Sequence, residues 1–260
     1  MLPVRQSQAT RSNQRLHHES ASRAPRSNLA CLGLAREAMG VGDPGDVVLI
    51  GGASLADFRI RVAQSHARHD LTPSHWSIVG ILSEQRELVT APLWPLPDPA
   101  SVPARNAIDT RPLSDFDSVS LYPNLAIVRF PSDAAAVLRH VRRLRRQRTI
   151  VDLPSLILAW LGFVWATADS PNPLLSGLGL PSAVLVETVF GMADVELTPG
   201  LAAASSCPEA IWQAARWWHG FYARAAGADI RQGADGEKLE AVPHGWWVVR
   251  QARASYVVPK

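Results

Sequence analysis

The chain has 260 residues, 47% of them hydrophobic, which is enough to bury a sizeable core and is typical of one main domain with appendages. Because 26 basic residues stand against 23 acidic ones, the net charge is only +3, and bulk charge does not identify a partner. The two cysteines, Cys31 and Cys207, exclude a disulfide framework and favour a reducing compartment, so we expect a cytoplasmic protein.

The first 27 residues differ in composition from the rest of the chain. They are rich in Arg, Ser, Gln and His, and Glu19 is their only acid. The few apolar side chains of this segment cannot offset the conformational entropy that it would lose on ordering. Residues 1–27 are therefore predicted to be a disordered basic tail. A targeting peptide is the alternative, but no signal peptide is expected because the segment lacks an apolar core. A main domain is predicted over 28–207, with a C-terminal helix and β-hairpin over 208–260.

The apolar spacing and the turn residues predict a mixture of helices and strands along the chain. The predicted helices cover 28–39, 54–69, 134–148, 153–166, 182–192 and 209–226, and the predicted strands cover 47–50, 78–82, 88–91, 125–130, 246–249 and 256–258.

The segment Ser74-His75-Trp76-Ser77 leads directly into the apolar strand 78–82. An earlier turn, Pro44-Gly45-Asp46, leads in the same way into the apolar strand 47–50. Two buried strands, one with a histidine at its entrance, make a plausible half of a catalytic cleft. His75 is therefore the candidate general base.

These motifs resemble those of a known superfamily. Pro44-Gly45-Asp46 before a strand, and Ser74-His75 before Ile78-Val79-Gly80, are similar to the signature of the NlpC/P60 papain-like proteins. The order of the pieces is similar to the circularly permuted branch, which holds YiiX/YaeF-like amidases and relatives of lecithin–retinol acyltransferases. There, the histidine strand precedes a nucleophile helix that reads Cys-Ser-x-Leu-Val-x-Glu, followed by a Thr-Pro turn. Residues 181–187 and Thr198-Pro199-Gly200 lie in the matching places.

The resemblance covers roughly residues 43–206 and implies an α+β, circularly permuted papain-like fold with a small antiparallel sheet packed on helices. It also implies cleavage or transfer at amide, thioester or acyl bonds by a cysteine with a histidine base. This chain departs from that pattern, because Pro181 stands where the family places its cysteine. Proline forms no thiolate. The residue that orients the histidine would fall at Thr90, a weaker partner than a carboxylate.

Two functions follow from this departure. The leading prediction is a catalytically degenerate homologue that binds a peptide, acyl or lipid ligand through the retained cleft. The alternative is an active hydrolase or acyltransferase in which Ser182 or Cys31 replaces the missing nucleophile. Ser182 follows the lost position but should point about 100° away around the helix axis. Cys31 stands before the histidine, as in unpermuted relatives, and Cys207, before Pro208, is a weaker candidate.

The predicted helix 134–148 carries its apolar residues on one face and six arginines, from Arg139 to Arg148, elsewhere. A solvated basic face is one interpretation. The other is an anionic partner, either nucleic acid or membrane headgroups. The apolar stretch 153–166 is too short to cross a hydrocarbon core of about 30 Å, so we expect no transmembrane segment and predict a buried or groove-lining helix.

No cofactor or metal is expected. His66, His69 and His75 could be drawn as a metal cluster, but no cysteine or acid follows at a helpful spacing, so solvated histidines are favoured. The turn at 50–54 has two glycines after a strand, yet it lacks the third glycine and the later acid of a dinucleotide-binding loop. We interpret it as a tight strand-to-helix turn.

Overall fold

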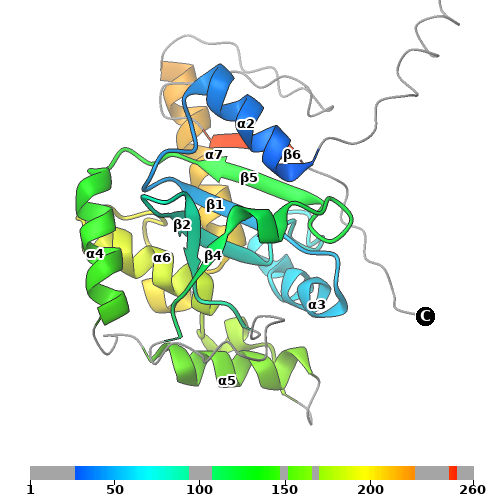
Figure 1. Cartoon of the computed structure of the whole chain (residues 1–260). Coiled ribbons are helices and arrows are strands. Elements are labelled where there is room, and N and C mark those ends of the chain that lie inside the picture. Colours follow the sequence, from blue (N-terminus) through cyan, green and yellow to red (C-terminus); the bar gives the residue numbers. More distant parts are fainter. Residues whose placement is uncertain (1–26, 94–106, 147–151, 166–169, 226–245, 251–260) are drawn as a thin grey trace, which may run out of the picture.

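The structure is a computed structural model that describes residues 27–93, 107–146, 152–165, 170–225 and 246–250 (Figure 1). The predicted tail up to residue 26 and the second predicted C-terminal strand, 256–258, lie outside these residues. The helices are α2 (Asn28–Met39), α3 (Leu55–Ala63), α4 (Ala134–Arg146), α5 (Leu153–Val164), α6 (Pro181–Gly191) and α7 (Pro208–Ala225). The strands are β1 (Val47–Gly51), β2 (Ile78–Leu82), β3 (Glu87–Thr90), β4 (Asp109–Pro112), β5 (Asn124–Val128) and β6 (Trp246–Arg250). Four short 3-10 helices are η1 (Ser65–Ala67), η2 (Leu113–Phe116), η3 (Pro173–Ser176) and η4 (Ala203–Ser205).

The strands form one sheet in the order β4-β3-β2-β1-β5-β6, and every neighbouring pair is antiparallel. The α+β class expected from the sequence is therefore confirmed. Strands β1 and β2 are interior, which explains why all five residues of each are buried and why both read as continuous apolar runs. Strand β6, from the C-terminal segment, pairs with β5 at one edge.

The two faces of the sheet have separate cores. Val47 and Leu49 point into the larger core, which also holds side chains of α3, α4, α5, α6 and α7. Val48 and Ile50 point into a smaller core, against which Leu32 of α2 packs. Figure 1 shows the same division, with α2 on one side of the sheet and α3, α5 and α6 on the other. The period-2 alternation of strand side chains thus decides which helices each residue meets.

Several details differ from the sequence-based expectations. The helix predicted over 54–69 ends at Ala63, and the chain then continues as the short 3-10 helix η1. Strand β4 was not predicted.

The N-cap of α2 is Ser27, whose hydroxyl accepts from the backbone of Ala30, whereas Asn28 donates its amide to backbone carbonyls of Phe116 and Tyr122, at 2.8 Å each. Asn28 therefore ties α2 to the loop before β5.

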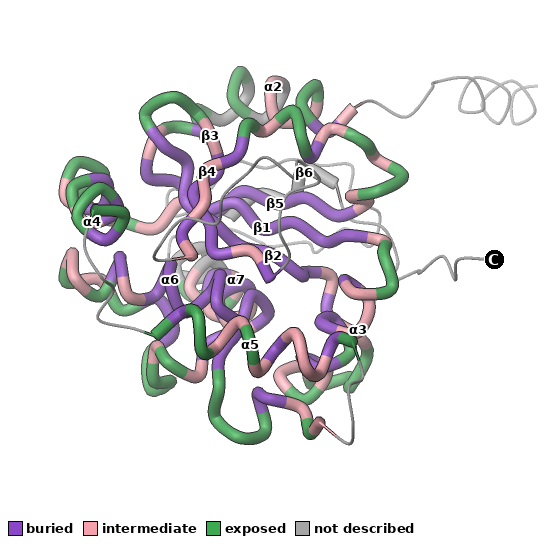
Figure 2. The backbone as a smooth tube through the Cα atoms, turned by 60° about the horizontal axis from the view of Figure 1, so that its bottom comes forward, coloured by how far each residue is buried: buried purple, intermediate pink, exposed green. Residues whose placement is uncertain are grey.

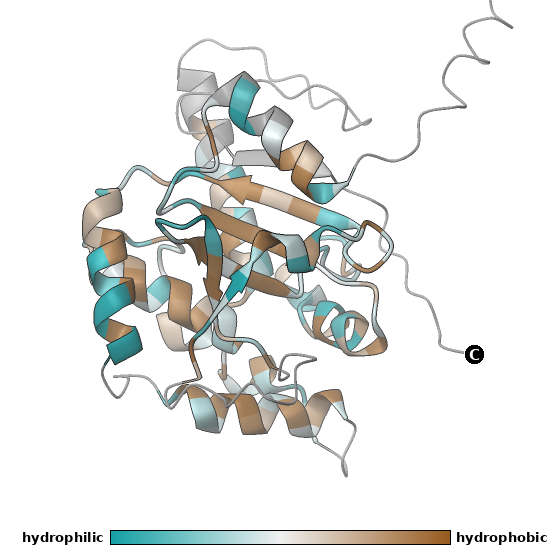
Figure 3. Ribbon diagram, in the orientation of Figure 1, coloured by the Kyte–Doolittle hydropathy of each residue, from teal (hydrophilic) through white to brown (hydrophobic). Residues whose placement is uncertain are grey.

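Helix α5 is less buried than its composition predicts. Leu153, Trp160 and Val164 are buried in the larger core. Leu158, however, is 70% exposed, and Trp165, directly after the helix, is 68% exposed. Figure 2 shows exposed and intermediate residues along α5, and Figure 3 shows that the helix is hydrophobic along most of its length. The helix is thus buried on one face and exposed on another, so it is not a helix buried on all sides.

In the part of the chain that the structure describes, none of the helices combines the length and the apolar character needed to cross a bilayer.

Candidate functional site at the beginning of β2

The segment before β2 is held by hydrogen bonds from two helices. The hydroxyl of Ser74 donates to Glu209 of α7 (2.6 Å) and accepts from the backbone nitrogen of Trp76 (3.0 Å). Arg61 of α3 donates its Nε to the carbonyl of Ser74 at 2.6 Å, and Gln64 donates to the carbonyl of Trp76 at 2.8 Å. Satisfied buried polar groups of this kind fix a segment in one conformation. The backbone of His75 is consequently held between two anchored neighbours.

His75 lies against the ends of β1 and β5. Its carbonyl accepts from the side-chain amide of Asn124 at 3.1 Å, and a Cβ added at Gly51 would stand 1.8 Å from the same oxygen. Only glycine permits that approach. The imidazole lies edge-on to Trp76, with ring centroids 6.1 Å apart, and Trp76 in turn packs edge-on against Trp212 of α7. The half-buried ring therefore has an apolar wall on the side of α7.

The electrostatic environment keeps this imidazole neutral. Burial lowers the pKa of His75 to about 4, and the positive charges of Arg68, Arg61 and, to a lesser extent, Arg216 act in the same direction, whereas Asp70 opposes them. At pH 7 the ring can therefore accept a proton, as a general base must. Its Nδ1 atom is buried and has no hydrogen-bond partner among the described residues. Among the residues that the structure describes, none therefore orients the imidazole through its Nδ1 atom.

Helix α6 begins near the same end of the sheet. Pro181 occupies its first turn, and the preceding Leu180 donates its backbone nitrogen to the carbonyl of Ser206 at 2.8 Å, just before α7. The N-termini of α6 and α7 therefore lie together. Glu209 of α7 contacts the segment of His75, while α6 packs directly on β2. The structure thus brings the helix of Pro181 and the histidine segment to one end of the sheet.

Ser182 does not contact the histidine. Its hydroxyl lies 3.4 Å from the backbone nitrogen of Val79, which donates to it, and the residue is only 3% exposed. Val79 is four residues beyond His75, a separation of up to about 13 Å in extended chain. A nucleophile and its base must come within hydrogen-bond reach of each other. The hydrogen bond described for the Ser182 hydroxyl therefore runs to β2 and not to its predicted partner.

The two cysteines that are candidate nucleophiles are also poorly placed. Cys31 lies on α2, which packs on the smaller core, on the face of the sheet opposite to α6 (Figure 1). Cys207 is buried, and the loss of solvation raises its pKa to about 12. A thiol with such a pKa is protonated at pH 7 and is a poor nucleophile. Thr90, the predicted orienting residue, instead donates its hydroxyl to the carbonyl of Val79 at 2.7 Å.

Two further residues of the sequence motif, Glu187 and Thr198, are in contact. Glu187 of α6 accepts hydrogen bonds from the hydroxyls of Thr198 (2.6 Å) and Ser206 (3.0 Å). Burial raises the pKa of Glu187, although these hydrogen bonds pull it in the opposite direction. The buried carboxyl group thereby fastens the Thr198 turn and the segment before α7 to α6, so its contacts are those of a structural residue.

Two polar residues near the site escaped the sequence-based prediction. Glu209 receives the Ser74 hydroxyl and also the side-chain amide of Gln213 at 2.5 Å. Asp57 receives the hydroxyls of Ser54 and Ser77, both at 2.6 Å. Burial is the main influence on both carboxyl groups and raises each pKa. The spacing of Ser54 and Asp57 at a helix start was a recognisable capping signal. For Glu209, the sequence showed only an acid in the first turn of a helix, which does not predict its contact with Ser74.

Metal binding has no support in the described ranges, where no group of three His, Cys, Asp or Glu side chains is close enough to hold an ion. His66 lies instead with its Nδ1 3.1 Å from the carbonyl of Ala63. His66 and His69 thus do not gather around His75 to form a cluster.

Comparison with known proteins adds no assignment: no family model matches the chain, and neither a curated protein nor a solved structure matches it at a significant level.

Proposed function

We propose that this chain is a non-catalytic protein of the permuted NlpC/P60 papain-like type, and that it binds a ligand at the His75 end of its sheet. The order of the elements supports the proposal. A histidine stands before an interior antiparallel strand, a later helix packs on that strand, and the residues Glu187 and Thr198 of the resemblance hydrogen-bond to each other. These contacts are compatible with a retained scaffold.

The observation that carries the proposal is Pro181 in the first turn of α6. A thiolate at a helix N-terminus is activated by the helix dipole and by a nearby base, and proline offers no atom for that role. The two nearest substitutes fail on geometry, since Ser182 contacts β2 and Cys31 lies across the sheet. A neutral histidine remains, and its buried Nδ1 has no hydrogen-bond partner among the described residues, which supports the proposal.

The surroundings of His75 favour a ligand with an electron-rich oxygen. A neutral imidazole can donate one N–H to a carbonyl, and Arg68, Arg61 and Arg216 place positive charge around the ring. We therefore infer that a peptide or acyl carbonyl group binds there without being cleaved. The ester carbonyl of a lipid acyl group offers the same kind of acceptor oxygen.

The test combines turnover with binding on the full-length chain. Acetylated dipeptide amides and short acyl thioesters are offered as substrates, and binding is followed by the ring resonances of His75, assigned by comparison with His75→Gln. We expect the His75 resonances to move on titration while no product forms. Product formation that is lost in His75→Gln would instead support the active hydrolase or acyltransferase. Resonances that stay unmoved at millimolar ligand would count against binding at this site.

A further inference from the structure

One face of α5 is apolar and exposed. Pro154, Leu158, Leu161 and Trp165 are spaced by four, three and four residues, which places them on one side of the helix and its end. Leu158 and Trp165 are 70% and 68% exposed, and Leu161 is partly exposed. Leu175 of η3, a short helix that contacts α5, is 72% exposed. Contiguous exposed apolar surface of this kind marks an interaction site more often than single exposed side chains do.

The inner face of α5 already has a structural role. Leu153, Trp160 and Val164 are buried in the larger core, and the indole of Trp160 donates to the carbonyl of Gly179 at 2.8 Å. The helix contains no charged residue. Packing therefore explains the inner face, and it does not explain why the outer face is also apolar.

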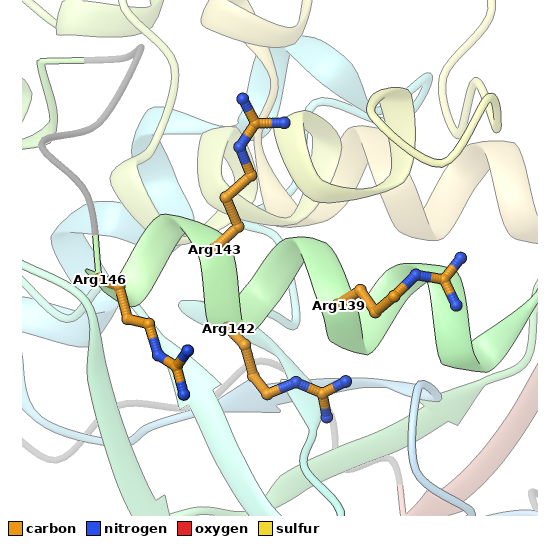
Figure 4. Close-up of a pocket in the computed structure, with 4 residues that line it drawn as sticks. All are labelled: Arg139, Arg142, Arg143 and Arg146. Atoms are coloured by element: carbon orange, nitrogen blue, oxygen red, sulfur yellow. The ribbon is translucent and has the colours of Figure 1, made fainter.

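A strongly basic surface lies on α4, the helix before α5 in the chain. Helix α4 contains five arginines and no acid, and Arg139, Arg142, Arg143 and Arg146 line an open pocket of about 310 Å³ (Figure 4). Figure 4 shows Arg143 pointing to one side of the helix and Arg142 and Arg146 to the other. Arg142 pairs with Glu84 at 2.6 Å, and Arg139 lies 3.8 Å from Asp133. Positive charge therefore predominates around the pocket.

The two surfaces lie at one end of the molecule. Figure 1 shows the C-terminal end of α4 and the length of α5 toward the same end, and both helices pack on α6. Another cation lies by the far end of α5, because Arg59 of α3 donates to the carbonyl of Val164. Arginines thus stand near both ends of the apolar face.

We propose that the exposed face of α5 and the arginines of α4 together form a docking surface for an anionic lipid bilayer. Leucine and tryptophan would enter the interface between headgroups and acyl chains, while guanidinium groups would contact phosphate and carboxylate headgroups. Charge complementarity selects the anionic membrane, and the apolar face selects a bilayer over nucleic acid, which offers little apolar surface to a helix. The twelve residues of α5 lie on such a surface and do not cross it.

The test measures co-sedimentation of the full-length chain with vesicles of phosphatidylcholine alone and with vesicles in which a quarter of the lipid is phosphatidylserine. We expect binding to the anionic vesicles that weakens at high salt. Replacing both apolar anchors, as Leu158→Glu with Trp165→Glu, should lower the partition coefficient at least tenfold. Replacing Arg142 and Arg146 by Gln should lower it by roughly fivefold for each arginine removed.

The matched control is Leu121→Glu, at a leucine that is 61% exposed in the loop before β5, and it should leave binding unchanged. Circular dichroism checks that every variant is folded, which is expected because the replaced side chains are exposed. Three results would overturn the proposal. The first is vesicle binding that the α5 variant does not weaken, as binding through another basic segment would give. The second is tighter binding to a short DNA duplex that depends on the α4 arginines alone. The third is self-association that the α5 variant abolishes, without any vesicle binding.

Discussion

The hydroxyl of Ser182, in the first turn of α6, lies 3.4 Å from the backbone nitrogen of Val79 in β2. A serine that serves as a nucleophile must point its oxygen toward a substrate and accept help from a base. This one is buried between a helix and a strand. Its contact is the packing contact of an interior residue, and the function proposed for the chain follows from that placement together with Pro181.

Restoring the family residue tests the scaffold. In Pro181→Cys, a thiol would stand in the first turn of α6, where the helix dipole favours the thiolate. A His75 ring within reach would take up the thiol proton, and the resulting imidazolium would stabilise the thiolate further. We expect alkylation by iodoacetamide at pH 7 to be faster than that of a free cysteine, whose pKa is about 8.5. The rate should fall when His75→Gln is added. A cysteine as slow as the buried Cys207 would show that the site is closed, and the chain would then be an interaction module without a cleft.

Glu187 is predicted to stabilise the fold through hydrogen bonds that the neutral acid also makes. Glu187→Gln keeps an acceptor for Thr198 and Ser206, so its free energy of unfolding should stay within about 1 kcal/mol of the wild type at pH 7. Glu187→Ala leaves two buried hydroxyls without their acceptor and should lose about 2–4 kcal/mol. Urea unfolding measures both values. Equal losses in the two variants would contradict a hydrogen-bonding role.

Ser74 is predicted to hold the histidine segment in place. Ser74→Ala removes the donor to Glu209 and the acceptor for the nitrogen of Trp76, so we expect a loss of about 1–3 kcal/mol in unfolding free energy. Ser118→Ala is a suitable control, because that exposed hydroxyl pairs only with the exposed Ser120 and with a turn nitrogen. Its stability should change by less than about 0.5 kcal/mol. A Ser74 variant as stable as this control would rule out the anchoring role.

The lowered pKa of His75 predicts a pH dependence of stability with a defined sign. Between the unfolded value of 6.5 and the folded value of about 4, the unfolded chain binds a proton at this site and the folded chain does not. This contribution is therefore fully present above pH 6.5 and is lost as the pH falls toward 4. Because the ring is only partly buried, we expect a loss on the order of 1–2 kcal/mol. Urea midpoints at pH 7 and pH 4.5 should accordingly differ more for the wild type than for His75→Gln. A variant with the same pH dependence as the wild type would mean that His75 titrates normally.

Local features of the sequence predicted much of the fold. The apolar runs 47–50 and 78–82, each introduced by turn residues, became β1 and β2, and Pro181 marked the start of α6. Long-range polar contacts were not predictable in this way. Ser74 and Glu209 are 135 residues apart, and no spacing rule connects a serine before a strand with an acid in a distant first turn. The exposed face of α5 was missed because a helix that is apolar on all sides reads as buried, whichever face meets the core.

The central claim is that His75 works with no nucleophile among the residues that the structure describes, and covalent labelling tests it most directly. The full-length wild type and His75→Gln are treated at pH 7 with a fluorophosphonate and with an acylating thiol probe, and intact mass and peptide mapping locate every adduct. We predict no adduct on Ser182 and no labelling that depends on His75, so that any modification of the partly exposed Cys31 is equal in both proteins. An adduct on Ser182 or Cys31 that forms in the wild type and disappears in His75→Gln would contradict the account.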